Sequence, residues 1–185
     1  MAKKALVFLA NGFEEVEAVT PIDYLRRSGV EVTTVSIGNE RTATGSHNIP
    51  VIADTLLSGA VAGNMAYDAL LLPGGMPGAS NLAASAALGA LLKAQAASGR
   101  IVAAICAAPA VVLAPLGILE GKRFTCYPGM EDKVKGAQWS DERVVIDGNI
   151  VTSRGAGTAA AWAVALIGLL QGPKEGETIA RSVLL

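Results

Sequence analysis

The chain has 185 residues, and its 15 basic and 16 acidic residues leave a formal net charge of −1. This length favours one domain, residues 1–185, with a well-buried core. The balanced charge shows no basic face, which argues against nucleic acid as a partner. Apolar residues make up 51% of the chain but aromatic residues only 4%, so small aliphatic side chains are expected to fill the core.

The two cysteines, Cys106 and Cys126, are too few for a disulfide framework and lack the CxxC spacing. A reducing compartment is therefore expected. Residues 1–15 hold two lysines and a short apolar run, without the longer apolar core and the cleavage site of a signal peptide. We interpret the run as a first strand and expect a cytoplasmic protein.

The first half of the chain alternates between apolar runs and helical periodicity. Residues 14–29 have apolar side chains at positions 16, 19, 22 and 25, a helical period that ends at Gly29. Pro21 lies inside this helix and predicts a kink or a distorted turn. A second helix is expected at 80–98. Strands are expected at residues 5–10, 30–38 and 67–75, with a short one within 47–57.

The second half continues the alternation. Residues 142–155 contain an Asp-Gly pair between two β-rich runs, which predicts a hairpin. Two uncharged stretches, 101–119 and 155–173, approach the ~20 residues of a membrane span. Prolines in the first and a loop-like start in the second favour a strand then a helix, and a buried helix, with no membrane partner. The other expected elements are strands at 100–106 and 122–129 and helices at 108–117, 157–171 and 174–183.

Strands that are apolar throughout, with helices between them, indicate a mostly parallel sheet covered on both faces. The sequence thus predicts a single three-layer α/β/α sandwich with a β-hairpin near residues 143–153. In such sheets the functional site lies beyond the carboxyl ends of the strands. This rule selects three loops, at residues 11–17, 74–78 and 106–109.

Cys106 stands where an expected strand meets the next helix, which resembles a nucleophile elbow. Ala107 and Ala108 leave room for a sharp turn, and Pro109 suits the first helical turn. A helix N-terminus that faced the sulfur would lower the pKa of the thiol below its ordinary value of ~8.5. The alternative is a buried structural cysteine.

Two other loops offer groups that suit chemistry at this thiol. The N–H groups of Gly74 and Gly75 could bind an oxyanion or a carboxylate, although a plain turn would use the same residues. Of Glu14, Glu15 and Glu17, a carboxyl that faced inward would be protonated and would donate a hydrogen bond to sulfur. The residues alone do not choose among the three glutamates.

His47 is the single histidine, and its polar surroundings predict a surface or interface position. One histidine and two distant cysteines make no metal-ligand set, and no phosphate-binding glycine motif occurs. We therefore expect no metal and no cofactor. Cys126 lies within an expected strand, where we favour packing with a secondary redox role.

A family resemblance is carried by four stretches: residues 8–29 (FLANGFEEVEAVTPIDYLRRSG), 70–82 (LLLPGGMPGASNL), 98–113 and 152–159 (TSRGAGTA). Together they resemble the ThiJ/PfpI superfamily, in the branch of the Parkinsonism-associated protein deglycase and the bacterial YajL-like proteins. The resemblance spans nearly the whole chain. It implies a flavodoxin-like sandwich that forms a two-fold homodimer.

The resemblance also implies roles for single residues. Cys106 matches the family's nucleophile, and Glu17 matches a glutamate that hydrogen-bonds the sulfur while protonated. Tyr127 stands where some members have a histidine, so Glu17 would move protons alone or with Tyr127. Binding of an oxyanion or substrate is expected at Gly74, Gly75 and Ala107. Pocket or dimer contacts are expected at Asp23, Arg27, His47 and Tyr127.

The activity implied by the resemblance is that of a cofactor-free enzyme of carbonyl stress defence. Such an enzyme converts α-oxoaldehydes such as methylglyoxal into 2-hydroxy acids, or reverses early glycation adducts, so its partner is a small aldehyde or a glycated substrate. The alternative is a redox sensor or stress chaperone in which Cys106 is oxidised to a sulfinate. A cysteine peptidase, which would need His47, and a protein of thiazole-phosphate (thiamine) biosynthesis are weaker alternatives.

Overall fold

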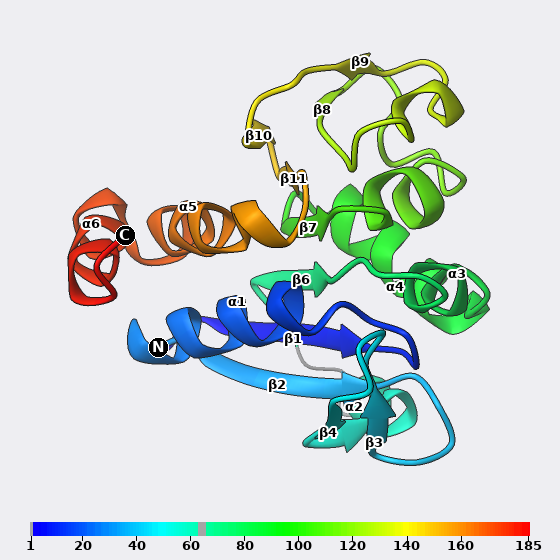
Figure 1. Ribbon diagram of the computed structural model, residues 1–185, viewed down its shortest axis with the longest axis horizontal. Helices are drawn as coiled ribbons and strands as arrows, with labels where there is room; N and C mark the ends of the chain where they lie inside the picture. Colours follow the sequence, from blue (N-terminus) through cyan, green and yellow to red (C-terminus); the bar gives the residue numbers. More distant parts are fainter. Residues whose placement is uncertain (1, 63–65) are drawn as a thin grey trace.

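The centre of the fold is a seven-stranded sheet in the order β10-β11-β7-β6-β1-β2-β5 (Figure 1). It is seen in a computed structural model that describes residues 2–62 and 66–185. Neighbouring strands run parallel except for β10 and β11, which form the predicted hairpin. The strands are β1 (Lys4–Leu9), β2 (Glu31–Ser36), β5 (Thr55–Leu56), β6 (Ala69–Leu72), β7 (Ile101–Ile105), β10 (Val144–Asp147) and β11 (Ile150–Ser153).

Helices cover both faces of this sheet and complete the three layers that the sequence predicts (Figure 1). One face carries a core that includes Leu25, Trp162 and Ile179. These residues come from α1 (Glu15–Arg27), α5 (Ala159–Gln171) and α6 (Pro173–Ser182). The other face is covered by α2 (Leu57–Ala62), α3 (Gly78–Ala83), α4 (Ala86–Ala97) and a short π-helix (Pro109–Leu113).

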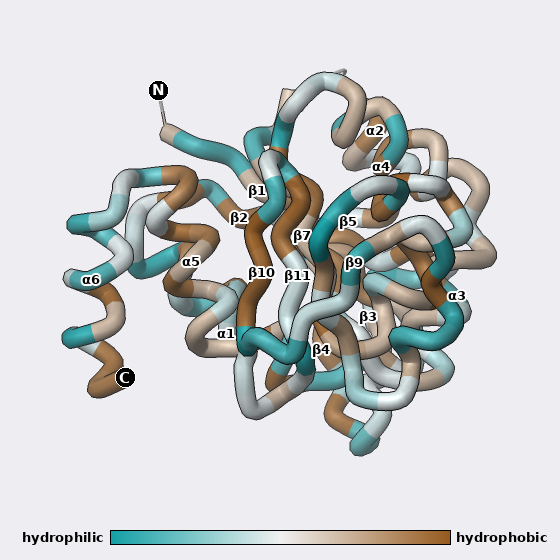
Figure 2. Tube along the Cα trace, turned by 90° about the horizontal axis from the view of Figure 1, so that it is seen from above, coloured by the Kyte–Doolittle hydropathy of each residue, from teal (hydrophilic) through white to brown (hydrophobic). Residues whose placement is uncertain are grey.

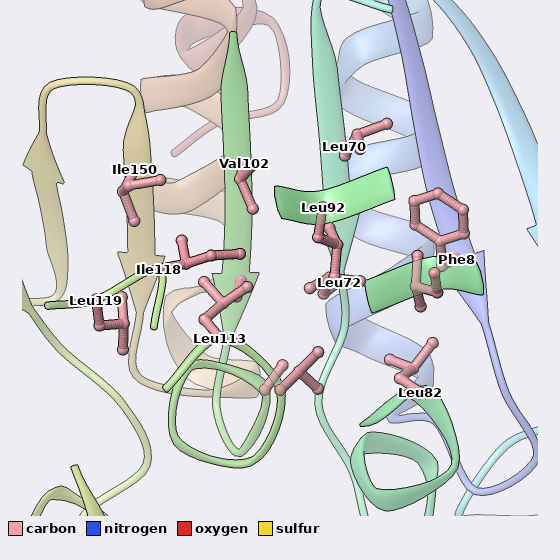
Figure 3. Packing of buried hydrophobic residues seen from close by; sticks show 14 of the residues in the cluster. Phe8, Leu70, Leu72, Leu82, Leu92, Val102, Leu113, Ile118, Leu119 and Ile150 are labelled. Atoms are coloured by element: carbon pink, nitrogen blue, oxygen red, sulfur yellow. The ribbon is translucent and has the colours of Figure 1, made fainter. Parts of the chain in front are cut away.

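The second core shows why apolar strands were needed. Phe8 and Leu70 from the sheet are fully buried beside Leu92 of α4 and Leu113 of the π-helix (Figure 3). Burying a side chain of this size stabilises the fold by about 1.5–3 kcal/mol. Figure 2 shows the apolar colour following β10, β11 and β7 through the middle of the molecule, with more hydrophilic colour on α6.

Two predicted helices differ from the structure. The expected helix at 80–98 is divided into α3 and α4, because the Ser85 side chain accepts the N–H of Leu88 and caps a new helix. The helix expected at 108–117 is only a π-helical turn, in which the N–H of Ala114 donates to Pro109 O at 3.0 Å. Pro115 follows at once and has no N–H with which to continue the ladder.

Small sheets flank the main one. β3 (Thr42–Thr44), which the sequence analysis missed, pairs with β4 (Pro50–Ile52) inside the expected strand region 47–57. β8 (Arg123–Phe124) pairs with β9 (Gln138–Trp139) and is much shorter than the strand expected at 122–129. It ends early because the chain turns toward β7, where the N–H of Tyr127 donates to Cys106 O. The remaining elements are two short 3₁₀ helices, at Glu131–Lys133 and Ala156–Thr158.

The two long apolar stretches follow the expected order of elements, except that only a π-helical turn stands where a helix was expected after β7. Residues 101–119 divide between β7 and the π-helix with its following turns, and residues 155–173 are mostly α5. No helix in the described ranges is long and apolar enough to cross a membrane. α1 runs from Glu15 to Arg27 as one helix, with Pro21 buried inside it.

Candidate active site

The three loops selected by the sequence meet at the carboxyl edge of the sheet. The N–H of Glu14 donates to Gly74 O at 3.1 Å, and the N–H of Gly78 donates to Gly12 O at 3.1 Å. These bonds join the loop after β1 to the loop after β6. Cys106, which directly follows the last residue of β7, lies beside them.

Cys106 occupies a sharp turn with a backbone φ of +63°. Residues other than glycine seldom adopt this left-handed backbone conformation. Neighbouring backbone holds the turn on both sides: the N–H of Cys106 donates to Ser153 O at 3.0 Å, and its carbonyl accepts the N–H of Tyr127 at 2.8 Å. The side chain is half-buried, so the predicted elbow presents its sulfur to the pocket described below.

Glu17 is the glutamate that faces this sulfur. Its side chain is 1% exposed, accepts the N–H of Gly74 at 2.8 Å and is hydrogen-bonded with Cys106. Glu14 instead caps α1, because its carboxylate accepts the N–H of Glu17 at 2.7 Å. The structure therefore makes the choice among the three glutamates that the sequence left open.

Burial raises the pKa of Glu17 from an ordinary 4.5 to about 7, although hydrogen bonds from Gly74 and with Cys106 act in the opposite direction. A buried carboxylate loses the water that stabilises its charge, so the neutral form is favoured. Glu17 therefore exchanges its proton near neutral pH.

The pKa of the Cys106 thiol is also raised, to about 12. Burial is the largest cause, and the negative charge of Glu17 adds to it, whereas the hydrogen bond from Gly75 opposes the rise. The lowered pKa expected from a helix N-terminus is wrong, because one π-helical turn aligns too few peptide dipoles to outweigh burial beside a carboxylate. The two groups titrate as a pair, in which an ionised Glu17 keeps the thiol protonated.

The backbone amides around the sulfur divide into two sets. The N–H groups of Gly75 and Ala107 point at Cys106, whereas the N–H of Gly74 is occupied by the Glu17 carboxyl. Of the two ligands expected for the Gly74 N–H, an oxyanion or a carboxylate, the structure shows the carboxyl of Glu17. A Cβ at residue 74 would lie 2.6 Å from Cys106 Cβ and 2.8 Å from Glu17 Oε2, so only glycine fits between the pair.

His47 lies in a loop held by Glu15. The Glu15 carboxylate accepts the N–H of His47 at 2.7 Å and is 2.8 Å from its Nδ1. Burial raises the pKa of Glu15, but these hydrogen bonds outweigh it and leave the pKa below its ordinary value. Ligand atoms of Glu14, Glu15 and His47 lie within 4.8 Å of one another, but both oxygens of Glu15 already bind the loop. We therefore interpret the group as a structural anchor.

Asp23 and Arg27 form an ion pair with a 2.6 Å contact on the exposed surface of α1. Val16 and Val19 on the same helix are each 49% exposed. Within the described part of the chain, neither Asp23 nor Arg27 has a hydrogen bond to Cys106. The structure thus places these residues on an outer surface.

A pocket of about 350 Å³ opens over the sulfur. Sequence reasoning found four of the residues that line it but missed Met76, Pro128 and Met130. Met76 directly follows the glycine pair, which is a local signal, whereas residues 128 and 130 reach the site only because the loop after β8 turns back over β7. The lining residues are Gly75, Met76, Cys106, Ala107, Tyr127, Pro128 and Met130.

A model of the DJ-1/PfpI family matches residues 3–169. The chain belongs to this family. Protein DJ-1 homolog B of Arabidopsis thaliana is 41% identical over 99% of the chain, which covers 42% of that relative, so the chain spans under half the length of this plant protein. A Caenorhabditis elegans relative named glutathione-independent glyoxalase DJR-1.2 is 35% identical, with 99% of the chain and 97% of the relative covered.

The DJ-1/PfpI fold is equally clear among solved structures. Oxidized Toxoplasma gondii DJ-1 superimposes with a TM-score of 0.95 at 41% identity, covering 99% of the chain and 98% of that protein. The flavodoxin-like sandwich expected from the family resemblance is thus confirmed.

Proposed function

We propose that this DJ-1/PfpI protein is a cofactor-independent enzyme that converts small α-oxoaldehydes such as methylglyoxal into 2-hydroxy acids. The observation that carries the proposal is the buried Glu17 carboxyl, hydrogen-bonded with the Cys106 thiol and with a pKa of about 7. A general base is most effective when its pKa lies near the working pH. The name of the Caenorhabditis elegans relative, a glutathione-independent glyoxalase, supports the same reaction class.

The first step joins sulfur to the aldehyde. Ionised Glu17 accepts the thiol proton as Cys106 attacks the aldehyde carbon, and the carbonyl π electrons move to the oxygen. The N–H groups of Gly75 and Ala107 stabilise the developing oxyanion. Glu17 then gives the thiol proton to this oxygen, so the product is a hemithioacetal and the carboxyl is ionised again.

The second step moves hydrogen between neighbouring carbons. Ionised Glu17 removes the proton from the former aldehyde carbon, and the electron pair shifts toward the neighbouring carbonyl oxygen to give an enediolate. Glu17 returns this proton to the adjacent carbon, and the hydroxyl proton passes from the first oxygen to the second. The result is a thioester of the 2-hydroxy acid. Water then cleaves the carbon–sulfur bond, which releases the acid and restores the thiol.

Lactate release from methylglyoxal tests this function. We expect turnover by the wild type, loss in Cys106→Ala, and retention in the matched control Cys126→Ala, since Cys126 is 1% exposed in the core. Equal rates for the wild type and Cys106→Ala would contradict the proposal. Deglycation of early adducts is a second activity that the same nucleophile would support.

Oxidation of Cys106 is a second candidate function, in line with the half-buried sulfur beside a carboxyl that donates a hydrogen bond when protonated. Two molecules of peroxide would convert the thiol to a sulfinic acid and form two of water. A stable gain of two oxygens confined to Cys106, measured by mass after mild peroxide, supports sensing. Oxidation spread equally to Cys126 argues against it.

Two further expectations concern a cysteine peptidase activity and a homodimer. A cysteine peptidase is disfavoured because the ring of His47 is bound to Glu15. A homodimer stays part of the proposal, supported by the exposed Val16 and Val19 of α1 and by Ile52 of β4, which is 70% exposed. Sedimentation of the purified chain tests the dimer.

A further inference from the structure

The pocket over Cys106 has two chemically different halves. Its inner end presents the N–H groups of Gly75 and Ala107 to the sulfur. Its outer wall is built from Met76, Tyr127 and Met130, together with a proline. Among the described residues that line this pocket, none carries a charged side chain. A ligand seated here therefore has polar atoms near the sulfur and an apolar group against the wall.

The wall is held beside the nucleophile by backbone. The N–H of Tyr127 donates to Cys106 O at 2.8 Å, and the N–H of Met130 donates to Tyr127 O at 3.1 Å. The Tyr127 ring lies along Gly155, where an added Cβ would be 3.6 Å from its Cδ2. Met76 and Tyr127 remain 52% and 53% exposed, so a bound group would cover apolar surface that water now contacts.

We propose that this wall makes the protein selective for α-oxoaldehydes with a single aromatic ring, such as phenylglyoxal, over methylglyoxal. The inference rests on the proposed function. A volume of about 350 Å³ lies at the small end of ligand pockets, roughly 300–1,000 Å³, and so suits one ring. Thioether sulfur and a tyrosine ring both make favourable contacts with an aromatic group.

The reaction with phenylglyoxal keeps the same balance of atoms. Cys106 adds to the aldehyde carbon, Glu17 transfers the proton to the neighbouring ketone carbon, and water releases 2-hydroxy-2-phenylacetate. The ring takes no part in bond making. Its contribution is binding energy at Met76 and Met130, which selects among aldehydes.

The first test compares the ratio of kcat/KM for phenylglyoxal to that for methylglyoxal between protein variants, so that the intrinsic reactivity of each aldehyde cancels. We expect this ratio to fall about tenfold in Met76→Ser/Met130→Ser, since small changes of apolar contact are worth 10–200-fold. The control is Ile146→Ser, an apolar residue of β10 that is 45% exposed and outside the pocket. It should leave the ratio unchanged. An unchanged ratio in the double variant would overturn the inference.

A second test needs no turnover. The rates at which N-phenylmaleimide and N-methylmaleimide alkylate Cys106 are measured by mass and normalised to glutathione. We expect a phenyl preference in the wild type that falls in Met76→Ser alone and in the double variant. A phenyl preference without any aldehyde turnover would contradict the proposed function but would still support the selectivity of the pocket. Methylglyoxal turnover that depends on Cys106 but shows no phenyl preference would contradict only the proposed selectivity for aromatic aldehydes.

Discussion

The N–H of Gly74 donates to Glu17 Oε2 at 2.8 Å, and this bond holds the carboxyl against the catalytic sulfur that we propose. The same glycine leaves the space through which the Glu17 and Cys106 side chains meet. A Cβ at this position would lie 2.6 Å from Cys106 Cβ. Residue 74 therefore acts as a positioning residue for both partners.

Gly74→Ala should separate the pair. Overpacking of this kind costs about 1–3 kcal/mol of stability, and a displacement of ~1 Å at a reacting group can cost roughly 10²-fold in rate. We expect methylglyoxal turnover to fall about 100-fold while the far-ultraviolet circular dichroism stays native. Gly38→Ala is the control, because its added Cβ would meet only ordinary contacts of 3.6 Å and beyond. Unchanged turnover in Gly74→Ala would argue against the pair as the reactive centre.

The activity should rise with pH through the titration of Glu17. Burial gives this group a pKa of about 7, and only the ionised carboxyl accepts the thiol proton. A profile of kcat/KM for methylglyoxal between pH 5.5 and 8.5, a window of about 1.5 pH units on either side of this pKa, should show a midpoint near that value. Glu17→Gln should lack this midpoint and lose most of the activity. If Glu17→Gln kept the pH profile of the wild type, the general base would have to be another group.

The same carboxyl should make stability depend on pH. The folded-state pKa of about 7 lies above the ordinary 4.5, so the folded state holds the proton more tightly. Its contribution is full below pH 4.5 and is lost as the pH rises through about 7, a change of roughly 3 kcal/mol. We expect Glu17→Gln to match the wild type in urea unfolding at low pH and to exceed it above neutral pH. Parallel curves for the two proteins would contradict the raised pKa.

His47 should keep its proton to a higher pH than an ordinary histidine. The hydrogen bond to Glu15, followed by the charge of that carboxylate, raises the pKa of the ring. NMR titration of this single histidine measures the value directly. Glu15→Gln removes the charge and should return the pKa toward 6.5. No change in the titration would show that the pair is absent in solution.

The order of elements and the position of the elbow are determined by the sequence itself. Apolar runs such as residues 101–105 lie in a strand because a parallel sheet covered on both faces needs apolar side chains on each side. Cys106 followed by two alanines and Pro109 marks the turn locally. The division of the helix at Ser85 and the short π-helical turn before Pro115 were missed, because the apolar periodicity continues through both boundaries. The first boundary is set by the Ser85 cap, and the second by the N–H that Pro115 lacks.

The chemistry of the site was decided by tertiary structure. The rotation of α1 against the sheet turns Glu17 to the sulfur and Glu15 to the loop of His47, a choice that three nearly adjacent glutamates do not reveal. Burial in that packed environment then raises the pKa of both the carboxyl and the thiol, against the local effect of a helix N-terminus. Tyr127, Pro128 and Met130 join the pocket wall because the hydrogen bond from the Tyr127 N–H to Cys106 O holds their loop over the sulfur. Contacts between distant parts of a chain leave no periodic signal in its sequence.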